Sequence, residues 1–225
     1  ASASPEQPQY QISKWSISNA LACYVADLRS FNSPFDQYVR GEREAIAAEV
    51  ERGFDLFMGK ANCGTCHFAP TFNGTVPPYF QESESEVLGV PAAAHGPDSL
   101  TLDPDPGRFA SYKPIDQTPF YLHSFKTVTV RNAALTAPYM HNGIYQSLEE
   151  VVDFYNKGGG AGMGIAVPYQ TLPDTPLELS EQEVQDLVAF MEALTDTTGM
   201  TAVPDSLPVF QHQPEWNKRE VGGSY

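Results

Sequence analysis

Two cysteines and a histidine lie within five positions of one another in the segment KANCGTCHFAP. Cys63, Cys66 and His67 could form a thiol redox pair, half of a zinc site or the attachment point of a covalent haem. A structural zinc ion needs four nitrogen or sulfur ligands, commonly in two separated pairs, and the only other cysteine is Cys23. A thioredoxin-type Cys-x-x-Cys normally follows a strand of a βαβ unit, whereas helix, glycine and loop are expected here. The zinc and thiol redox interpretations are therefore disfavoured.

The remaining interpretation explains the spacing of the motif. C-x-x-C-H is the attachment signature of c-type haem. Two thiols separated by two residues reach both vinyl groups at one edge of the porphyrin, and the histidine behind them falls beneath the iron as proximal ligand. Gly64 keeps the short bridge flexible. The sequence therefore predicts one covalent haem c, which is attached outside the bacterial cytoplasm.

Composition restricts the classes of function. The chain has 225 residues, of which 41% are hydrophobic, and this fits one large domain or one domain with long arms. A formal net charge of −15 argues against nucleic-acid binding, which needs Lys and Arg; it suits docking on basic partners, or simply a solvated acidic surface. The sequence contains no run of about 18 apolar residues, so no membrane span is predicted. The opening ASASPEQPQ resembles the start left after an export signal is removed, so we expect a periplasmic protein.

The elements that position the motif are predicted to be mainly helical. Apolar periodicity indicates one helix over about residues 12–28, with Cys23 as a small buried hydrophobe, and another over 42–58 that ends just before the motif. Asn, Ser and Pro in the segment 30–42 are expected to break the helical pattern between them. Residues from Pro70 to about Phe120 show little periodicity, which is typical of a functional loop or a wrap around a ligand.

Two further helices carry their own start signals. Ser147 is followed three residues later by Glu150, and Ser180 by Glu183, so both pairs predict capping boxes. Between them, FKTVTVRN is expected to include a short extended piece. The predicted class is mainly α: a c-type cytochrome domain with long irregular loops wrapped around one covalent haem.

Three segments together resemble the C-terminal half of the bacterial dihaem cytochrome c peroxidases and the related MauG proteins. They are GFDLFMGKANCGTCHFAP, FKTVTVRNAALTAPYMHNGIYQSLEEVVDFYNKGG and LSEQEVQDLVAFMEALT. A fourth segment, NALACYVADLRSFNSPFDQYVRGE, resembles the piece that joins the family's two haem domains. The resemblance implies an arm and interdomain-like helix over residues 1–40, a haem domain over 41–199 and a surface tail over 200–225.

The family carries two C-x-x-C-H motifs, whereas this chain carries one. The motif that has no counterpart here binds the haem at which peroxide reacts, so the matching half is the one with the six-coordinate, electron-relaying haem. The resemblance implies a periplasmic electron-transfer protein that works with a redox partner or a second haem-bearing subunit in peroxide-dependent oxidation. Two alternatives stay open: a self-sufficient mono-haem peroxidase that reduces hydrogen peroxide, and a structural or docking haem subunit of a larger complex or oligomer.

The resemblance also suggests a sixth iron ligand. Where the peroxidases have a methionine ligand this chain has Tyr155, as the MauG group does. The alternative is a plain core tyrosine, because Tyr155 shares a helix face with apolar neighbours. The choice matters because methionine raises the haem potential, whereas tyrosinate favours oxidised iron. The rival ligands are Met140, Met163 and Met191, of which packing fully explains the last.

Five more residues are implied by the resemblance. Thr136 and Pro138 match positions whose backbone carbonyls help to bind calcium in the family, with an ordinary loop as the alternative. Arg131 is expected to meet a haem propionate, and Lys126 to lie beside the haem pocket, with a surface salt bridge as the alternative. His141 lies in a loop expected close to the haem, either as a structural residue or as the acid–base residue of a mono-haem peroxidase.

Overall fold

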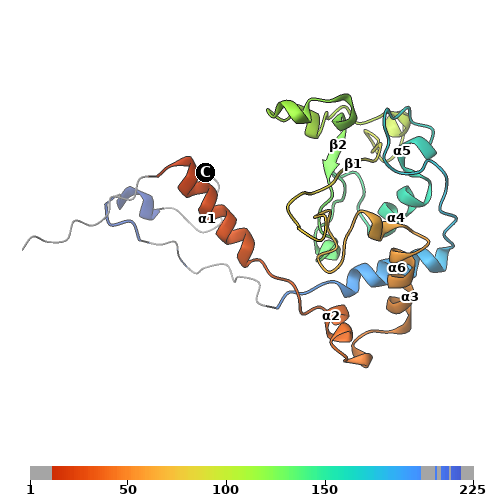
Figure 1. Cartoon of the computed structure of the whole chain (residues 1–225), viewed down its shortest axis with the longest axis horizontal. Helices are drawn as coiled ribbons and strands as arrows, with labels where there is room; N and C mark the ends of the chain where they lie inside the picture. The colour runs from red at the N-terminus through yellow and green to blue at the C-terminus, as the bar shows by residue number, and fades with distance from the viewer. Residues whose placement is uncertain (1–11, 199–205, 207–208, 213, 219–225) are drawn as a thin grey trace, which may run out of the picture. The chain divides into compact units, whose positions relative to one another are not determined.

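The computed structural model describes residues 12–198, 206, 209–212 and 214–218, and the chain divides into two compact units (Figure 1). One unit is Ala1–Arg29 with Thr198–Tyr225, and the other is Ser30–Thr197. The larger unit contains the cysteine motif and begins at Ser30. The domain boundary at residue 41 that the resemblance implies stays a prediction. Residues 1–11 and most of the predicted surface tail lie outside the described residues. No helix in the described part has the length and apolarity needed to cross a bilayer.

The regular elements of the described residues are short. The α-helices are α1 Lys14–Asp27, α2 Pro34–Val39, α3 Ala48–Met58, α4 Leu148–Asn156, α5 Gly159–Gly162 and α6 Glu181–Ala193. The strands β1 Ser85–Val87 and β2 Ser124–Lys126 form one antiparallel pair. The 3-10 turns are η1 Arg43–Ala45, η2 Cys63–Thr65, η3 Pro97–Leu100, η4 Arg108–Ala110, η5 Pro114–Asp116, η6 Pro119–Tyr121, η7 Ala133–Leu135 and η8 Pro214–Lys218. Helices joined by long irregular segments confirm the predicted mainly α class.

Helices α3 and α6 pack closely and centre the core of the larger unit. Gly53 permits this approach, because a Cβ at that position would lie 1.9 Å from the backbone oxygen of Asp186. Arg52 adds an ion pair to the Asp186 carboxylate at 2.7 Å. Phenylalanine rings interlock around the contact, with neighbouring centroids 5.0 Å to 6.1 Å apart. They are Phe35, Phe54, Phe57, Phe72 and Phe190.

The two predicted capping boxes are confirmed. The Ser147 hydroxyl accepts a hydrogen bond from the Glu150 N–H at 3.2 Å, and the Ser147 N–H donates to the Glu150 carboxylate at 3.3 Å. Ser180 and Glu183 exchange the same bonds at 3.3 Å and 2.8 Å. Helices α4 and α6 therefore begin where their local sequences place them.

The region before the cysteine motif differs from the prediction. The helix predicted over 42–58 begins only at Ala48, because Ile46 and Ala47 adopt extended backbone after the turn η1. The predicted break over 30–42 contains the six-residue helix α2, which is capped by Ser33 and Asp36. Proline at the first helical position and an acidic third position stabilise this start.

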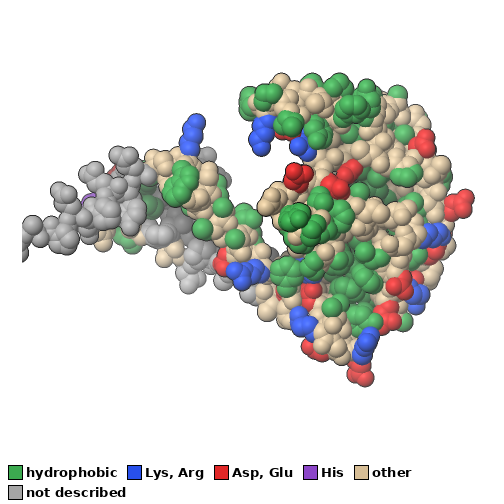
Figure 2. Space-filling view, in the orientation of Figure 1, with side chains coloured by type: hydrophobic (Ala, Val, Ile, Leu, Met, Phe, Trp, Pro, Cys, Tyr) green, Lys and Arg blue, Asp and Glu red, His purple; other side chains and the backbone are tan. Residues whose placement is uncertain are grey.

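Helix α1 lies within the range predicted for it, but its burial was predicted wrongly. None of its residues is buried, and Cys23 is exposed. Apolar side chains, including Trp15 and Leu21, stand at the surface over α1 (Figure 2). The apolar spacing therefore predicted the helix correctly. It did not predict that no other part of the described structure buries Cys23.

Candidate haem site

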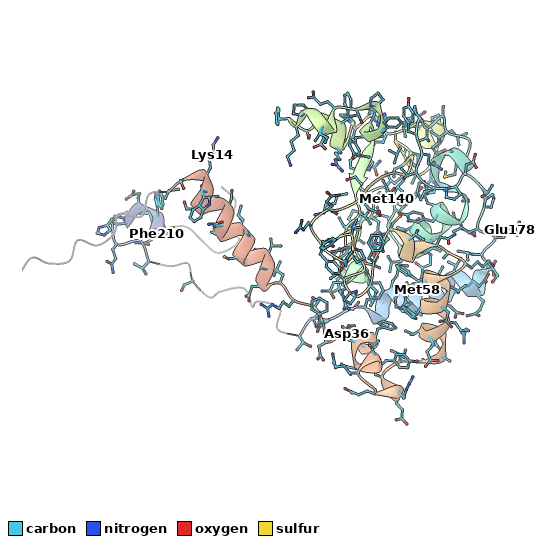
Figure 3. All side chains as sticks on the ribbon, viewed as in Figure 1. Lys14, Asp36, Met58, Met140, Glu178 and Phe210 are labelled. Carbon is cyan, nitrogen blue, oxygen red and sulfur yellow. The ribbon has the colours of Figure 1, made fainter. Side chains whose placement is uncertain are left out.

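The cysteine motif follows directly on the end of α3. The helix ends at Met58, and the His67 N–H then donates to the Cys63 carbonyl at 2.9 Å, which folds the motif into a single turn. A Cβ at Gly64 would lie 2.7 Å from the sulfur of Met58, a residue labelled in Figure 3. Because this sulfur belongs to the end of a flexible, exposed side chain that can move aside, the contact does not by itself require a glycine inside the motif.

The His67 ring is held by the backbone. Its Nδ1 lies 3.2 Å from the carbonyl oxygen of Phe72, which also accepts the Val130 N–H at 2.9 Å. Phe72 adopts φ 48°, in the left-handed region. Because a carbonyl only accepts, Nδ1 donates its proton in this contact. The backbone of Val128 makes a second hydrogen bond with the ring. Burial lowers the pKa of His67, so the neutral imidazole that a metal requires is favoured.

The two cysteines of the motif are protonated thiols. Burial raises the pKa of Cys63 to about 12. Burial also raises the pKa of Cys66, and the carboxylates of Glu86 and Glu84 add to the effect. Both sulfurs are free and neither is activated as a thiolate, whereas a catalytic thiol pair needs a lowered pKa. This chemistry disfavours the thiol redox interpretation and suits addition of two S–H groups across two vinyl groups.

Tyr155 lies on α4 in the same neighbourhood. Burial raises the pKa of its phenol, and the Cys63 and Cys66 sulfurs, whenever they ionise, and the Glu86 carboxylate raise it further. Its ring packs edge-on against Phe154, with centroids 5.6 Å apart. The fold thus brings the phenol into electrostatic range of both motif cysteines, although about ninety residues separate them in sequence. This placement fits a group bound between His67 and α4.

The rival methionines lie in different places. Met140 and Met163 are partly buried against the same small cluster as Tyr155, and Figure 3 shows Met140 within the larger unit. Met191 belongs to the other cluster, around α3 and α6, and is buried there. Packing therefore accounts for Met191, while Met140 and Met163 remain near the candidate site.

Arg131 and Lys126 lie in contrasting environments. The buried Arg131 guanidinium pairs with Asp36 at 2.8 Å and donates to the carbonyls of Pro70 and Ser30 at 2.8 Å and 2.9 Å. Its donors are thus engaged with protein, beside the loop that holds His67. Lys126 is exposed, and strand alternation places it on the opposite face of the ladder from Phe125. The predicted haem contacts of both residues stay predictions.

His141 forms a fixed pair with an acidic side chain. Its Nε2 lies 3.2 Å from Asp103 Oδ1, and the two side chains are 14% and 16% exposed. Its ring stacks on Phe125 with centroids 3.7 Å apart. A carboxylate that holds an imidazole fixes the ring orientation and its tautomer. His141 is therefore positioned through one nitrogen, and its predicted acid–base role stays a prediction.

Thr136 and Pro138 lie on an exposed loop after η7. The Thr136 hydroxyl donates to the Ala133 carbonyl at 3.1 Å, so the side chain is satisfied locally. Their backbone carbonyls suit a hard cation by type. Calcium at this loop stays a prediction.

Two functional candidates were missed from the sequence. Among the described residues, Cys66, Glu84 and Glu86 form the one group of His, Cys, Asp and Glu side chains that could share an ion, with ligand atoms within 4.8 Å of one another. The signal that could have found them is the alternation ESESEV, which places Glu84 and Glu86 on one face of a strand. Only the fold shows that this face meets Cys66.

Known proteins resemble this chain in sequence and in fold. The chain is 35% identical to cytochrome-c peroxidase IdrP2 of Denitromonas iodatirespirans over 199 residues, which cover 84% of the chain and 50% of that protein. It is 34% identical to methylamine utilization protein MauG of Methylorubrum extorquens, over 84% of the chain and 46% of that protein. No family model matches the chain. The chain therefore spans about half the length of the curated relatives it matches.

Solved structures agree with these sequence matches. A MauG-like protein associated with microbial copper homeostasis superposes with a TM-score of 0.63 at 29% identity, over 85% of this chain and 60% of that one. The diheme peroxidase BthA from Burkholderia thailandensis E264, at 23% identity and a TM-score of 0.52 over 80% of this chain and 51% of that one, shares the fold. The chain belongs to the family of MauG proteins and dihaem cytochrome c peroxidases.

Proposed function

We propose that the chain is a periplasmic c-type haem redox protein that transfers electrons through one covalent haem. Cys63 and Cys66 would carry the two thioether bonds, His67 would bind the iron through Nε2, and Tyr155 would be its second protein ligand. When bound, the haem supplies an iron that accepts and releases one electron at a time. The observation that supports this most is a His67 ring held through Nδ1 by the Phe72 carbonyl, with a pKa lowered by burial, beside two thiols whose pKa values burial raises.

Each of these side chains has a defined task. The Phe72 carbonyl holds the His67 ring and raises the basicity of Nε2 through its bond to the Nδ1–H. The Tyr155 phenol must lose its proton to act as an anionic ligand, and burial alone opposes this loss. The positive charge of a ferric centre acts in the other direction. Tyr155 would therefore be a ligand mainly of oxidised iron.

The irregular segments of the larger unit are proposed to wrap the haem. Backbone bonds tie the extended residues after β2 to the loop behind the motif, with the Gly74 N–H donating to the Thr127 carbonyl at 3.1 Å. The backbone carbonyls of the exposed residues Thr136 and Pro138 are proposed as calcium ligands, completed by a partner or by water.

A partner is part of this proposal. Relatives named as cytochrome-c peroxidases are about twice as long as the matched region. We infer that this chain relays electrons to or from a redox partner protein or a second haem-bearing subunit, and that the pair carries out a peroxide-dependent oxidation. The net charge of −15 favours a partner with a basic contact surface.

One observation supports a second candidate, a self-sufficient mono-haem peroxidase. The pairing of His141 with Asp103 resembles the way carboxylates orient imidazole bases in enzymes. This function would require a sixth iron position that peroxide can reach, so Tyr155 would have to leave the iron or never bind it.

Optical and EPR spectra of the matured ferric protein separate the two candidates. Low-spin iron that does not respond to added hydrogen peroxide is expected for the relay, whereas high-spin iron that consumes peroxide rapidly would support the peroxidase. Tyr155→Phe should convert low-spin to high-spin iron. Tyr145→Phe removes a hydroxyl from the same cluster and should leave the spectrum unchanged. A polypeptide mass without haem after maturation would contradict both.

A further inference from the structure

Glu84 and Glu86 lie at the edge of the candidate haem site. A carboxylate oxygen of each lies within 4.8 Å of the other and of the Cys66 sulfur. Glu86 is directly opposite Phe125 in the β1–β2 ladder, so the two side chains share a face, and the Phe125 ring stacks on His141. Figure 2 shows acidic side chains near β1. The same face of the ladder thus carries both carboxylates toward the sulfur that would hold the haem.

Among the described residues, no basic side chain forms an ion pair with these two carboxylates. Within the described residues, every ion pair is formed by an acidic residue other than Glu84 and Glu86. Both are half-buried, and burial together with the Glu86 charge raises the pKa of Glu84. The titratable groups on which Glu86 acts are His67, Tyr155 and Cys66 on other elements. Half-buried like charges are unfavourable unless a positive group faces them.

A metal ion bound by all three residues does not suit the proposed site. Once Cys66 has added to a vinyl group, its sulfur is a thioether and no longer offers a thiolate ligand. The two carboxylates would then lie near the edge of the haem. The charge that changes there during electron transfer is the charge of the iron.

We propose that Glu86, with Glu84 beside it, lowers the reduction potential of the haem attached at Cys66 by holding negative charge at the haem edge. This inference rests on the proposed function. Reduction adds one electron, supplied by the redox partner, to the iron and makes the whole centre more negative. A nearby carboxylate opposes that step whether the sixth ligand is neutral or anionic. Glu86 would be a tuning residue and not an iron ligand.

Spectroelectrochemical titration of the matured holoprotein tests this inference, with dithionite and ferricyanide as titrants. Glu86→Gln should raise the ferrous-to-ferric ratio at a fixed potential by about threefold to tenfold, the effect of one charge across about 10 Å of partly solvated protein. Tenfold corresponds to about 59 mV for a one-electron couple. Glu86→Asp, which keeps the charge, should stay close to wild type.

Glu82→Gln is the matched control, because Glu82 lies on the same segment but is exposed. An unchanged or lowered potential in Glu86→Gln, with normal haem content, would overturn the inference and leave the proposed function standing. If Glu86→Gln does not retain haem, Glu84→Gln decides by the same comparison, and an unchanged potential there would overturn it. A wild-type protein that matures without haem would instead remove the proposed function.

Discussion

The ion pair between Asp36 and Arg131 offers a sharp test of how the larger unit is held together. The two side chains are 13% and 7% exposed, and they share two bonds, at 2.8 Å and 2.9 Å. Arg131 also donates to the carbonyls of Pro70 and Ser30, so it links α2 and its approach to the loop behind the cysteine motif. Asp36→Asn keeps the shape of the side chain but leaves the buried guanidinium without its countercharge.

The cost can be estimated from burial. Removing one member of a buried ion pair typically lowers the free energy of unfolding by about 3–5 kcal/mol. Arg131 keeps its two carbonyl acceptors in the variant, so we expect the lower end, about 3 kcal/mol. Urea denaturation followed by circular dichroism would measure this as a lower midpoint with an unchanged slope.

Asp153→Asn is the matched control. Asp153 pairs with Lys157 one helical turn away, and both side chains are more than half exposed. Surface pairs of this kind contribute about 0.5 kcal/mol or less. If Asp36→Asn cost no more than Asp153→Asn, the buried pair would not stabilise the fold as argued. A double variant, Asp36→Leu with Arg131→Met, should cost less than the sum of the two single changes.

Two further predictions concern the contact between α3 and α6. Gly53→Ala should lower the free energy of unfolding by about 1–3 kcal/mol because its Cβ would meet the Asp186 backbone, whereas Glu51→Ala on the same helix should not; equal stability of both variants in urea would contradict the packing argument. The hydrogen bond from Arg52 lowers the pKa of Asp186, so this group's stabilisation is present above its unfolded-state pKa and is lost as pH falls through the folded-state pKa. Asp186→Asn should therefore flatten the acid side of the profile of melting temperature against pH, and an unchanged acid limb would count against the pair.

Local signals in the sequence predicted those helix starts and ends that depend only on adjacent residues. The capping boxes at Ser147 and Ser180 and the end of α3 at Met58 need only a few adjacent side chains, and the structure confirms them. Helix α2 carries the same kind of signal at Ser33, but its short length among turn-forming residues concealed it. The sequence could not show whether Cys23 is buried, because apolar periodicity identifies the apolar face of a helix and not the element that packs against it.

The candidate site divides in the same way. Cys63, Cys66 and His67 are adjacent in sequence, so their spacing alone predicts the chemistry. The closeness of Tyr155 depends on how α4 packs, and the sequence suggested it only through the family resemblance. The fixing of His67 by the Phe72 carbonyl, and the approach of Glu86 to Cys66, arise from tertiary contacts that no local pattern encodes.

The carbonyl of Phe72 has one more consequence. Both of its lone pairs are used, one by the His67 ring and the other by the Val130 amide. The acceptor that orients the ring belongs to the main chain, so mutating any single side chain leaves that oxygen in the polypeptide. A screen of point variants would therefore overlook it, and only replacing the amide linkage by an ester, or shifting the segment that carries Val130, could reveal how much the imidazole depends on it.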